Sequence, residues 1–473
     1  MCRRTISRRA CLLLVVIAAV MFLPSSAFTQ TSGTTSGTTS GSSSTDNTNN
    51  SLIQSGVVVD AEGVLRNKTF ADPGGQLTRE RIAAAKTTLD PKVTTYSKLR
   101  KISLNRLEAA IRQHQDVLSE EMRSLAGLQR IQYVFYYPDT KDIVIAGPAE
   151  GWITNVSGRV VGMTSGRPVV QLQDLVVGLR SFPPTGKKTS FIGCSIDPTP
   201  EGLAAMQQFV RSIHPSPNDV EFIVEGLRTK MGMQNISVNG VSPNTRFAQV
   251  MVEADYRMKL IGIGLEKPPI KLITYLDRVT ASEFNSNASQ RWFFVPDYQC
   301  VRVSNDSLAM ELVGDGVKLV GENELLSASG QRQSVSSVNK ASKIFETGFT
   351  KSYPQLAERM PLYADLRNLI DIAIATAYIQ QQDYYAKAGW KMEFFGDESA
   401  FPVETYEIPK TVQTVVNAVW KGSTLVTPVS GGVQIQPTKA LESDKLLTDE
   451  KGQVAKLRQD IKINLVKGQW WWD

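Results

Sequence analysis

The sequence predicts a mixed α/β (α+β) fold in which short antiparallel hairpins and meanders alternate with capped helices, in two to three packed domains. Three observations predict it. Short apolar segments separated by turn residues indicate hairpins. Serine or threonine directly before proline recurs in the middle of the chain and indicates helix starts. Residues 52–473 are enough for more than one domain.

The first 27 residues have the order of a cleavable export signal. Arginines precede an apolar run from Leu12 to Leu23, and Ser25 and Ala27 occupy the small-residue positions that predict cleavage after Ala27. The run is shorter than the roughly 20 residues that span a bilayer. We therefore expect export to the periplasm, cell surface or medium, with no transmembrane segment after signal removal. Ser7–Leu12 also resembles a twin-arginine signal, so both export routes stay open.

Removal of the signal also changes the charge of the chain. The full chain carries 52 Lys and Arg against 46 Asp and Glu, a net charge of +6. The signal contains four arginines and no acid, so the rest has a net charge of +2. Because no long cationic stretch remains, nucleic-acid binding is disfavoured. Residues 28–51 are almost entirely Ser, Thr, Gly and Asn, which predicts a disordered linker.

Residues 52–181 are expected to form an N-terminal α+β domain. Val57–Val59 and Val64–Leu65 flank an Asp-Ala-Glu-Gly turn, which predicts a hairpin. Ser103 can cap a helix whose buried face includes Leu104. Further strands are predicted over 131–137 and 143–146, and a hairpin through Ser157–Gly158.

Residues 189–385 are expected to form a central α/β domain with a strand meander and a long helix. Thr199, Ser216 and Ser242 each precede a proline, which predicts three helices. An apolar face after Pro361 indicates a core helix rather than a membrane span. The remaining elements expected in this region are strands over 191–196 and 234–239, the meander over 292–320 and helical sequence over 339–382.

Residues 386–473 are expected to form a C-terminal hairpin region with a charged helical tail. A strand is predicted near Met392–Phe395 and a hairpin over Thr424–Ile435. The helical tail is expected over Ala440–Gln459. The terminal Trp470–Trp472 can stack on sugars or a partner, but three adjacent large apolar side chains more often fold back onto a core.

Few residues carry recognisable chemistry. His114 and His214 lack metal-site spacing and a catalytic partner, and no nucleotide-binding or serine-hydrolase motif is present. We therefore expect neither a metal nor a cofactor. In the mature chain, Cys194 and Cys300 form either a disulfide or two buried free thiols.

Acidic residues are the remaining candidates. Asp197 and Glu201 follow a predicted strand and lead into a helix, where sites of α/β folds commonly lie. They are weak catalytic candidates, since Asp before a capped helix is more often a turn former. Glu253 with Arg257, and Asp255 with Lys259, have the spacing of surface ion pairs on a helix.

Several blocks of sequence resemble a family of exported planctomycete proteins that carry a domain of unknown function. These blocks are Gly56–Leu65, Ser103–Ala110, Gly147–Trp152, Ile196–Gly202, Val252–Lys259 and Phe293–Tyr298. The resemblance spans most of residues 52–436 and implies export and a shared fold. It implies no activity, cofactor or catalytic residue.

The leading functional hypothesis is a non-enzymatic envelope or secreted protein that binds a partner or helps organise the cell surface. The partner is expected to be an envelope protein or glycan, and the oligomeric state is left open. One alternative is a carboxylate-dependent hydrolase of envelope glycan or peptide that uses Asp197 and Glu201. Another is a soluble small-ligand binding protein. A closed cleft favours the small-ligand alternative, whereas an exposed apolar patch favours partner binding.

Overall fold

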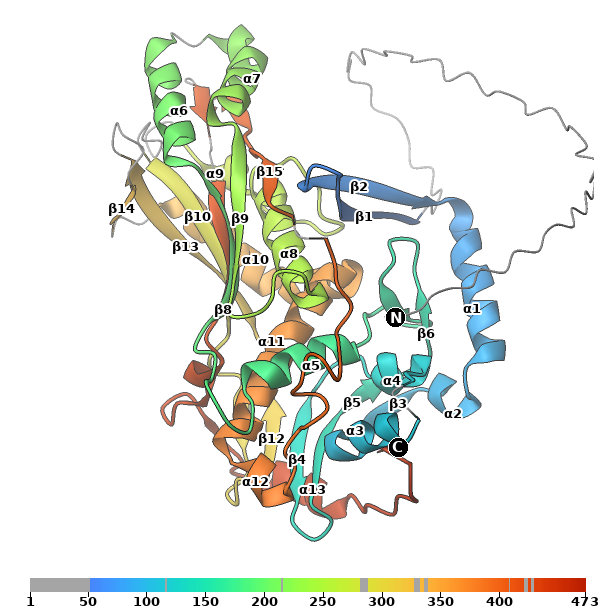
Figure 1. Cartoon of the computed structure of the whole chain (residues 1–473). Coiled ribbons are helices and arrows are strands. Elements are labelled where there is room, and N and C mark those ends of the chain that lie inside the picture. Colours follow the sequence, from blue (N-terminus) through green and yellow to red (C-terminus); the bar gives the residue numbers. More distant parts are fainter. Residues whose placement is uncertain are drawn as a thin grey trace, which may run out of the picture. The chain divides into compact units, whose positions relative to one another are not determined.

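The computed structural model has the predicted mixed α/β fold, built around two large sheets (Figure 1). It describes residues 52–114, 117–213, 216–280, 288–326, 332–335, 339–407, 409–420, 424–426 and 429–473. The predicted signal segment, the linker and His214 lie outside the described residues. Both large sheets take strands from all three predicted regions, and the domain boundaries themselves stay predictions.

The larger sheet has nine strands in the order β1-β2-β15-β9-β8-β18-β10-β13-β14. Most neighbours are antiparallel, but β15 is parallel to β2 and β18 is parallel to β10. The strand bounds are β1 Leu52–Val59, β2 Val64–Asp72, β8 Ile192–Pro198, β9 Met233–Asn239, β10 Ala288–Pro296, β13 Val317–Leu326, β14 Arg332–Val335, β15 Thr411–Gln413 and β18 Val429–Ile435.

The second sheet has seven strands in the order β19-β11-β12-β4-β5-β3-β20. Their bounds are β3 Ser97–Ser103, β4 Tyr133–Tyr137, β5 Asp142–Ala149, β11 Val301–Val303, β12 Ala309–Leu312, β19 Leu447–Thr448 and β20 Trp471–Trp472. Two small antiparallel pairs complete the strands described: β6 Trp152–Thr154 with β7 Val160–Gly162, and β16 Ala418–Trp420 with β17 Thr424–Val426.

Two helices dominate the interior. α8 (Arg246–Gly262) packs on β8 and β18, and α11 (Pro361–Gln381) packs on α5, α8 and α10 (Figure 1). Nearly every residue of both helices is buried, including charged residues of α8 such as Asp255 and Lys259. The other helices are α1 Gln76–Thr88, α2 Pro91–Thr94, α3 Leu104–Gln113, α4 Glu120–Arg123, α5 Leu172–Ser181, α6 Pro200–Ser212, α7 Val220–Met231, α9 Tyr275–Arg278, α10 Lys340–Arg359, α12 Tyr384–Ala388 and α13 Gln453–Asp460.

Most of the predicted helix starts are confirmed. The Thr199 hydroxyl accepts a hydrogen bond from the Gly202 backbone at 3.0 Å, and Ser216 forms a capping box ahead of α7. The prediction of Ser242 as a cap was wrong, because the N-cap residue of α8 is Thr245 and the helix begins at Arg246. Ser103 precedes α3, but its hydroxyl donates to Asp142 instead of capping the helix.

The predictions for residues 386–473 were less accurate. Phe394 and Phe395 lie in a turn rather than a strand, because their backbone N–H groups donate to the buried carboxylate of Glu108. The predicted hairpin over 424–435 was also wrong: β17 pairs with β16, whereas β18 inserts between β8 and β10. The tail over 440–459 is only partly helical, since α13 begins at Gln453.

The terminal tryptophans fold back, as the packing interpretation predicted. β20 pairs antiparallel with β3, and the guanidinium carbon of Arg100 lies 4.7 Å from the centre of the Trp471 ring. Arg100 is fully buried and donates two hydrogen bonds of 2.9 Å to the Asp473 side chain. The end of the chain is therefore fixed by both sheet pairing and a buried cation.

Candidate functional site

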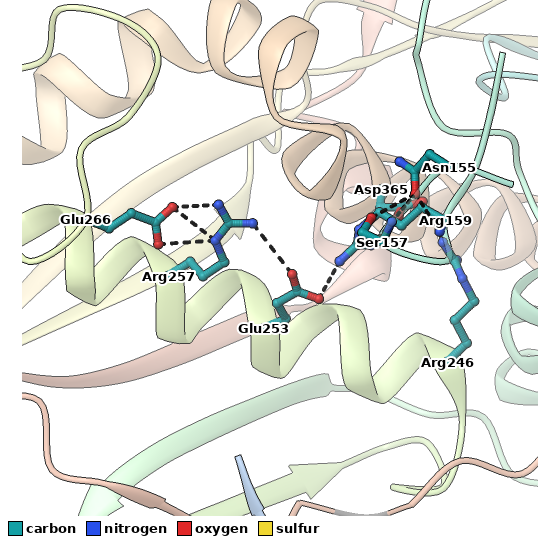
Figure 2. Close-up of polar contacts among 8 residues, drawn as sticks. All are labelled: Asn155, Ser157, Arg159, Arg246, Glu253, Arg257, Glu266 and Asp365. Atoms are coloured by element: carbon teal, nitrogen blue, oxygen red, sulfur yellow. Dashed lines mark hydrogen bonds and ion pairs between the residues drawn. The ribbon is translucent and has the colours of Figure 1, made fainter. Parts of the chain in front are cut away.

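Three adjoining clefts surround the loop Asn155–Arg159, which joins β6 to β7. The buried Asn155 carboxamide oxygen accepts hydrogen bonds from the Ser157 backbone, the Ser157 hydroxyl and the Arg159 backbone (Figure 2). This is the arrangement by which asparagine stabilises a tight turn. It fixes the backbone from which the Arg159 side chain extends.

The largest of these clefts, which we call the edge cleft, has a volume of about 450 Å³. Its walls come from β1, the Asn155–Arg159 loop, α8 and the segment around Tyr406. The lining residues are Val57, Val58, Val59, Leu65, Ser157, Gly158, Arg159, Arg246, Gln249, Val250, Glu253, Tyr406, Glu407 and Pro409. Clefts of about 410 and 200 Å³ adjoin it through Arg246 and through Arg159, respectively.

Val57, Val58 and Val59 are consecutive residues of one strand, and all three line the edge cleft. Successive side chains of a strand point to opposite faces, so three neighbours contribute to the lining from both sides of the strand or through its backbone. β1 is the first strand in the sheet order, and among the described residues it pairs only with β2. The cleft therefore lies against an edge strand of the nine-stranded sheet.

Behind the clefts lies a row of alternating charges, which we call the ion-pair chain. Four carboxylates and three guanidinium groups take part, and all seven side chains are largely buried, with exposures of 2–14%. In order, the members are Asp174, Arg246, Asp365, Arg159, Glu253, Arg257 and Glu266. Figure 2 shows all of them except Asp174.

Asp365 is the centre of the ion-pair chain. One of its oxygens accepts a hydrogen bond from Arg246 at 2.8 Å, and the other accepts one from Arg159 at 2.7 Å. Arg159 also contacts Glu253, and Arg246 also contacts Asp174. Each of these arginines therefore bridges two carboxylates, which ties α5, α8, α11 and the β6–β7 loop together.

The far end of the ion-pair chain joins α8 to the segment that follows it. Arg257 donates hydrogen bonds of 3.1 and 2.6 Å to Glu266 and lies 3.6 Å from Glu253. Burial lowers the pKa of Arg257, but the hydrogen bonds and charge of Glu266 outweigh burial, so the pKa is raised overall. The guanidinium group stays charged and has a recognition or structural role rather than a proton-transfer one.

Asp174, at the other end of the ion-pair chain, is incompletely satisfied. Burial raises its pKa to about 6, although Arg246 opposes the shift. One of its carboxylate oxygens is buried without a hydrogen-bond partner. For Arg246, burial lowers the pKa, but Asp174 and Asp365 outweigh it and the pKa is raised.

The helix pairs predicted for the surface exist but are buried. Lys259 lies 2.7 Å from Asp255, and both side chains are 0% exposed between α8 and the large sheet. Lys259 also donates to the backbone carbonyls of Ile196 and Gly431 at 3.3 and 3.4 Å. Burial raises the pKa of Asp255 to about 6, and Lys259 opposes the shift. The surface interpretation failed because α8 is enclosed by β8, β18, α5 and α11, so its charged positions are buried along with its apolar ones.

The candidate carboxylates do not line the edge cleft. Asp197 is 28% exposed and lies 3.4 Å from Arg291, and Glu201 is exposed in the first turn of α6. Their catalytic role stays a prediction. His114 follows the last residue of α3, where its backbone N–H donates to Ala110 and Ile111.

Both cysteines are buried free thiols, which is the second of the two alternatives for them. Burial raises the pKa of Cys300 to about 12 and that of Cys194 well above its usual value, so neither thiol is activated. Among the residues described, no group of three His, Cys, Asp or Glu side chains is placed to hold a metal ion. A search of the same residues finds no helix with the length and apolarity needed to cross a membrane.

The ion-pair chain was missed in the sequence. Arg246, Glu253 and Arg257 are spaced along one face of α8, a pattern that usually indicates a solvated face, yet all three side chains are largely buried. Arg159, Asp174 and Asp365 come from distant segments, and nothing in the linear sequence pairs them.

Comparison with known proteins adds one match. No curated protein and no solved structure matches the chain. Residues 194–275 match the model of a family described as a protein of unknown function, DUF1598. That segment runs from β8 to α9 and supplies Arg246, Glu253, Arg257 and Glu266, which are four of the seven charges of the ion-pair chain. At residues 194–275, this chain thus contains a DUF1598 domain, a domain of unknown function.

Proposed function

We propose that this is an exported, non-enzymatic protein that binds an extended segment of an envelope partner protein along the free edge of β1. The observation that carries the proposal is the edge cleft, which is lined by three consecutive residues of an edge strand together with polar side chains from other segments. An extended peptide adds to such an edge through main-chain hydrogen bonds, and neighbouring pockets select its side chains.

The composition of β1 supports this mode of binding. Edge strands are usually protected against pairing by charged residues, proline or bulges. β1 has the sequence Leu-Ile-Gln-Ser-Gly-Val-Val-Val, without a charge or a proline, and pairs with β2 in continuous register. An unprotected edge that opens onto a cleft is suited to a partner strand.

The opposite wall suits recognition rather than reaction. Arg159 and Arg246 line the edge cleft, but each is held by two carboxylates of the ion-pair chain. Groups fixed in this way are preorganised, so they bind without a large ordering cost. Gln249, Tyr406 and Glu407 add uncharged donors, a ring and an acid for side-chain selection.

The amino-terminal sequence supports export to the periplasm, cell surface or medium, where an envelope partner is available. A second candidate function, binding of a small ligand, is favoured by the volume of the edge cleft. About 450 Å³ falls within the range of small-molecule sites.

The test is site-specific photo-crosslinking of the full chain with a photoreactive residue at Val58, incubated with an envelope fraction. We expect a discrete crosslink to a short peptide segment of one protein, and a synthetic copy of that segment should slow amide exchange in β1. The matched control places the photoreactive residue at Leu77, which is 45% exposed on α1 and outside the cleft. Crosslinks confined to glycan or small molecules would favour the second candidate, and equal crosslinking at both positions would refute strand addition.

A further inference from the structure

A second cleft, which we call the arginine cleft, has a volume of about 270 Å³ and lies away from β1. It combines the segment before β4, the turn between β12 and β13, and the facing ends of α10 and α11. The lining residues are Gln129, Arg130, Gln132, Pro148, Arg167, Asp315, Pro354, Ala357, Glu358 and Arg367. Three arginines thus converge on one small cavity.

Arg367 is the unusual member. Its side chain is only 13% exposed, and in the described part of the chain it donates no hydrogen bond. Its one ion-pair contact, with Asp315, spans 3.7 Å, which is too long for a hydrogen bond. Its Nε atom is buried without a partner. A guanidinium group presents five donors, and in the described residues no acceptor lies within hydrogen-bond distance of this one, so its terminal nitrogens are available to a ligand in the cleft.

The two other arginines of the cleft are paired with acids, and neither acid is shared with Arg367. Arg130 uses Asp371 as its own partner, at 2.7 Å, and Asp371 is almost fully buried. Arg167 pairs with Glu358 at 3.3 Å in an exposed position. Both close ion pairs in the cleft are therefore already formed, and neither includes Arg367.

Asp315 is the nearest free acid and holds Arg367 loosely. It is 39% exposed and lies in a turn between Gly314 and Gly316, which have φ angles of +72° and +67°. Burial, and then the like charge of Arg130, lower the pKa of Arg367, and Asp371 and Asp315 oppose the shift without cancelling it. The acids near Arg367 therefore only partly compensate its charge.

We propose that the arginine cleft binds a small oxyanion, and that Arg367 is its main donor. Carboxylate, sulfate and phosphate all match the planar fork of a guanidinium group and accept two parallel hydrogen bonds from it. The bound group competes with Asp315 for Arg367 and leaves the Arg130–Asp371 pair in place. The site is separate from the edge cleft and goes beyond the binding function proposed above.

The experiment measures binding of phosphate, sulfate and acetate to the full chain by titration calorimetry and thermal shift, at constant ionic strength set with chloride. We expect at least one of the three to bind saturably and to raise the melting temperature. A response to acetate alone assigns the site to carboxylates, one to sulfate alone to sulfate esters, and one to phosphate alone to phosphoryl groups. No saturable effect from any of them would overturn the proposal.

Three variants locate the site. Arg367→Gln should lower the affinity for the anion at least tenfold, because it removes the main donor. Asp315→Asn should tighten binding severalfold, because it removes the competing carboxylate. Arg228→Gln, which alters an exposed pair with Glu225 on α7, should leave the affinity unchanged.

Equal anion affinity in wild type and Arg367→Gln would refute the assignment. If Arg367→Gln does not fold, the Asp315→Asn variant still decides the matter, since an unchanged or weaker affinity there contradicts the proposed competition.

Discussion

Asp365 and Arg367 lie two residues apart on α11, yet their surroundings differ completely. Asp365 receives hydrogen bonds from two arginines inside the ion-pair chain, whereas Arg367 donates none to any described residue and has its ion-pair carboxylate at 3.7 Å. Both side chains are largely buried, at 2% and 13% exposed. The difference shows that burial alone does not reveal what a charge does. A buried charge with a complete set of partners fixes the fold, whereas one without partners indicates a place for a ligand.

The largest expected effect on stability comes from replacing Asp365, the carboxylate with a complete set of partners. Asp365→Asn removes the carboxylate shared by Arg159 and Arg246, which leaves two buried guanidinium groups undercompensated. We expect a loss of about 3–5 kcal/mol in the free energy of unfolding. Urea denaturation at neutral pH measures it. A loss below about 1 kcal/mol would mean that the ion-pair chain does not stabilise the fold.

A pH titration tests the end of the same ion-pair chain. The pKa of Asp174 is raised to about 6 in the folded state, above its value in the unfolded chain. Its contribution to stability is therefore fully present below about pH 4 and is lost as the pH rises through 6. Relative to Asp174→Asn, the wild type should lose up to about 3 kcal/mol between pH 4 and 7. Denaturation curves of both proteins at several pH values give this difference, and a gap that stays constant with pH would contradict it.

Replacement of Arg367 is expected to change the free energy of unfolding in the opposite direction. Arg367→Met replaces a buried cation that has no hydrogen-bond partner with an apolar side chain of similar length. In anion-free buffer the variant should be more stable than the wild type by about 1–2 kcal/mol, because it removes an uncompensated desolvation cost. Thermal unfolding without and with the best anion measures both effects. Destabilisation in anion-free buffer would place Arg367 among the structural charges.

The smallest effect is expected at Asp315. Its contact with Arg367 is long, at 3.7 Å, and its side chain is 39% exposed. Asp315→Asn should therefore change the free energy of unfolding by less than about 0.5 kcal/mol in anion-free buffer. Chemical denaturation of Asp315→Asn and Asp365→Asn under the same conditions compares their losses in the free energy of unfolding. A large loss at Asp315 would show that the loose pair is itself structural.

Local features of the fold were predictable from the sequence, whereas long-range ones were not. The β1–β2 hairpin and the caps at Thr199 and Ser216 follow from residues a few positions apart. The insertion of β18 between β8 and β10 depends on packing between distant segments, so the nearby β17 was wrongly chosen as its partner. The same limit applies to the sites, since Arg159 and Asp365, or Arg130 and Asp371, meet only after folding.

The position of β18 has a consequence for biogenesis. β8 and β10 are not neighbours in the sheet, because β18, from near the end of the chain, lies between them. Until β18 has been synthesised, β8 and β10 each lack the strand that pairs with them in the folded sheet. The sheet can be completed only after residues 429–435 have been made. Nascent chains of this protein are therefore expected to remain incompletely folded until β18 has left the ribosome, a state that requires protection from aggregation.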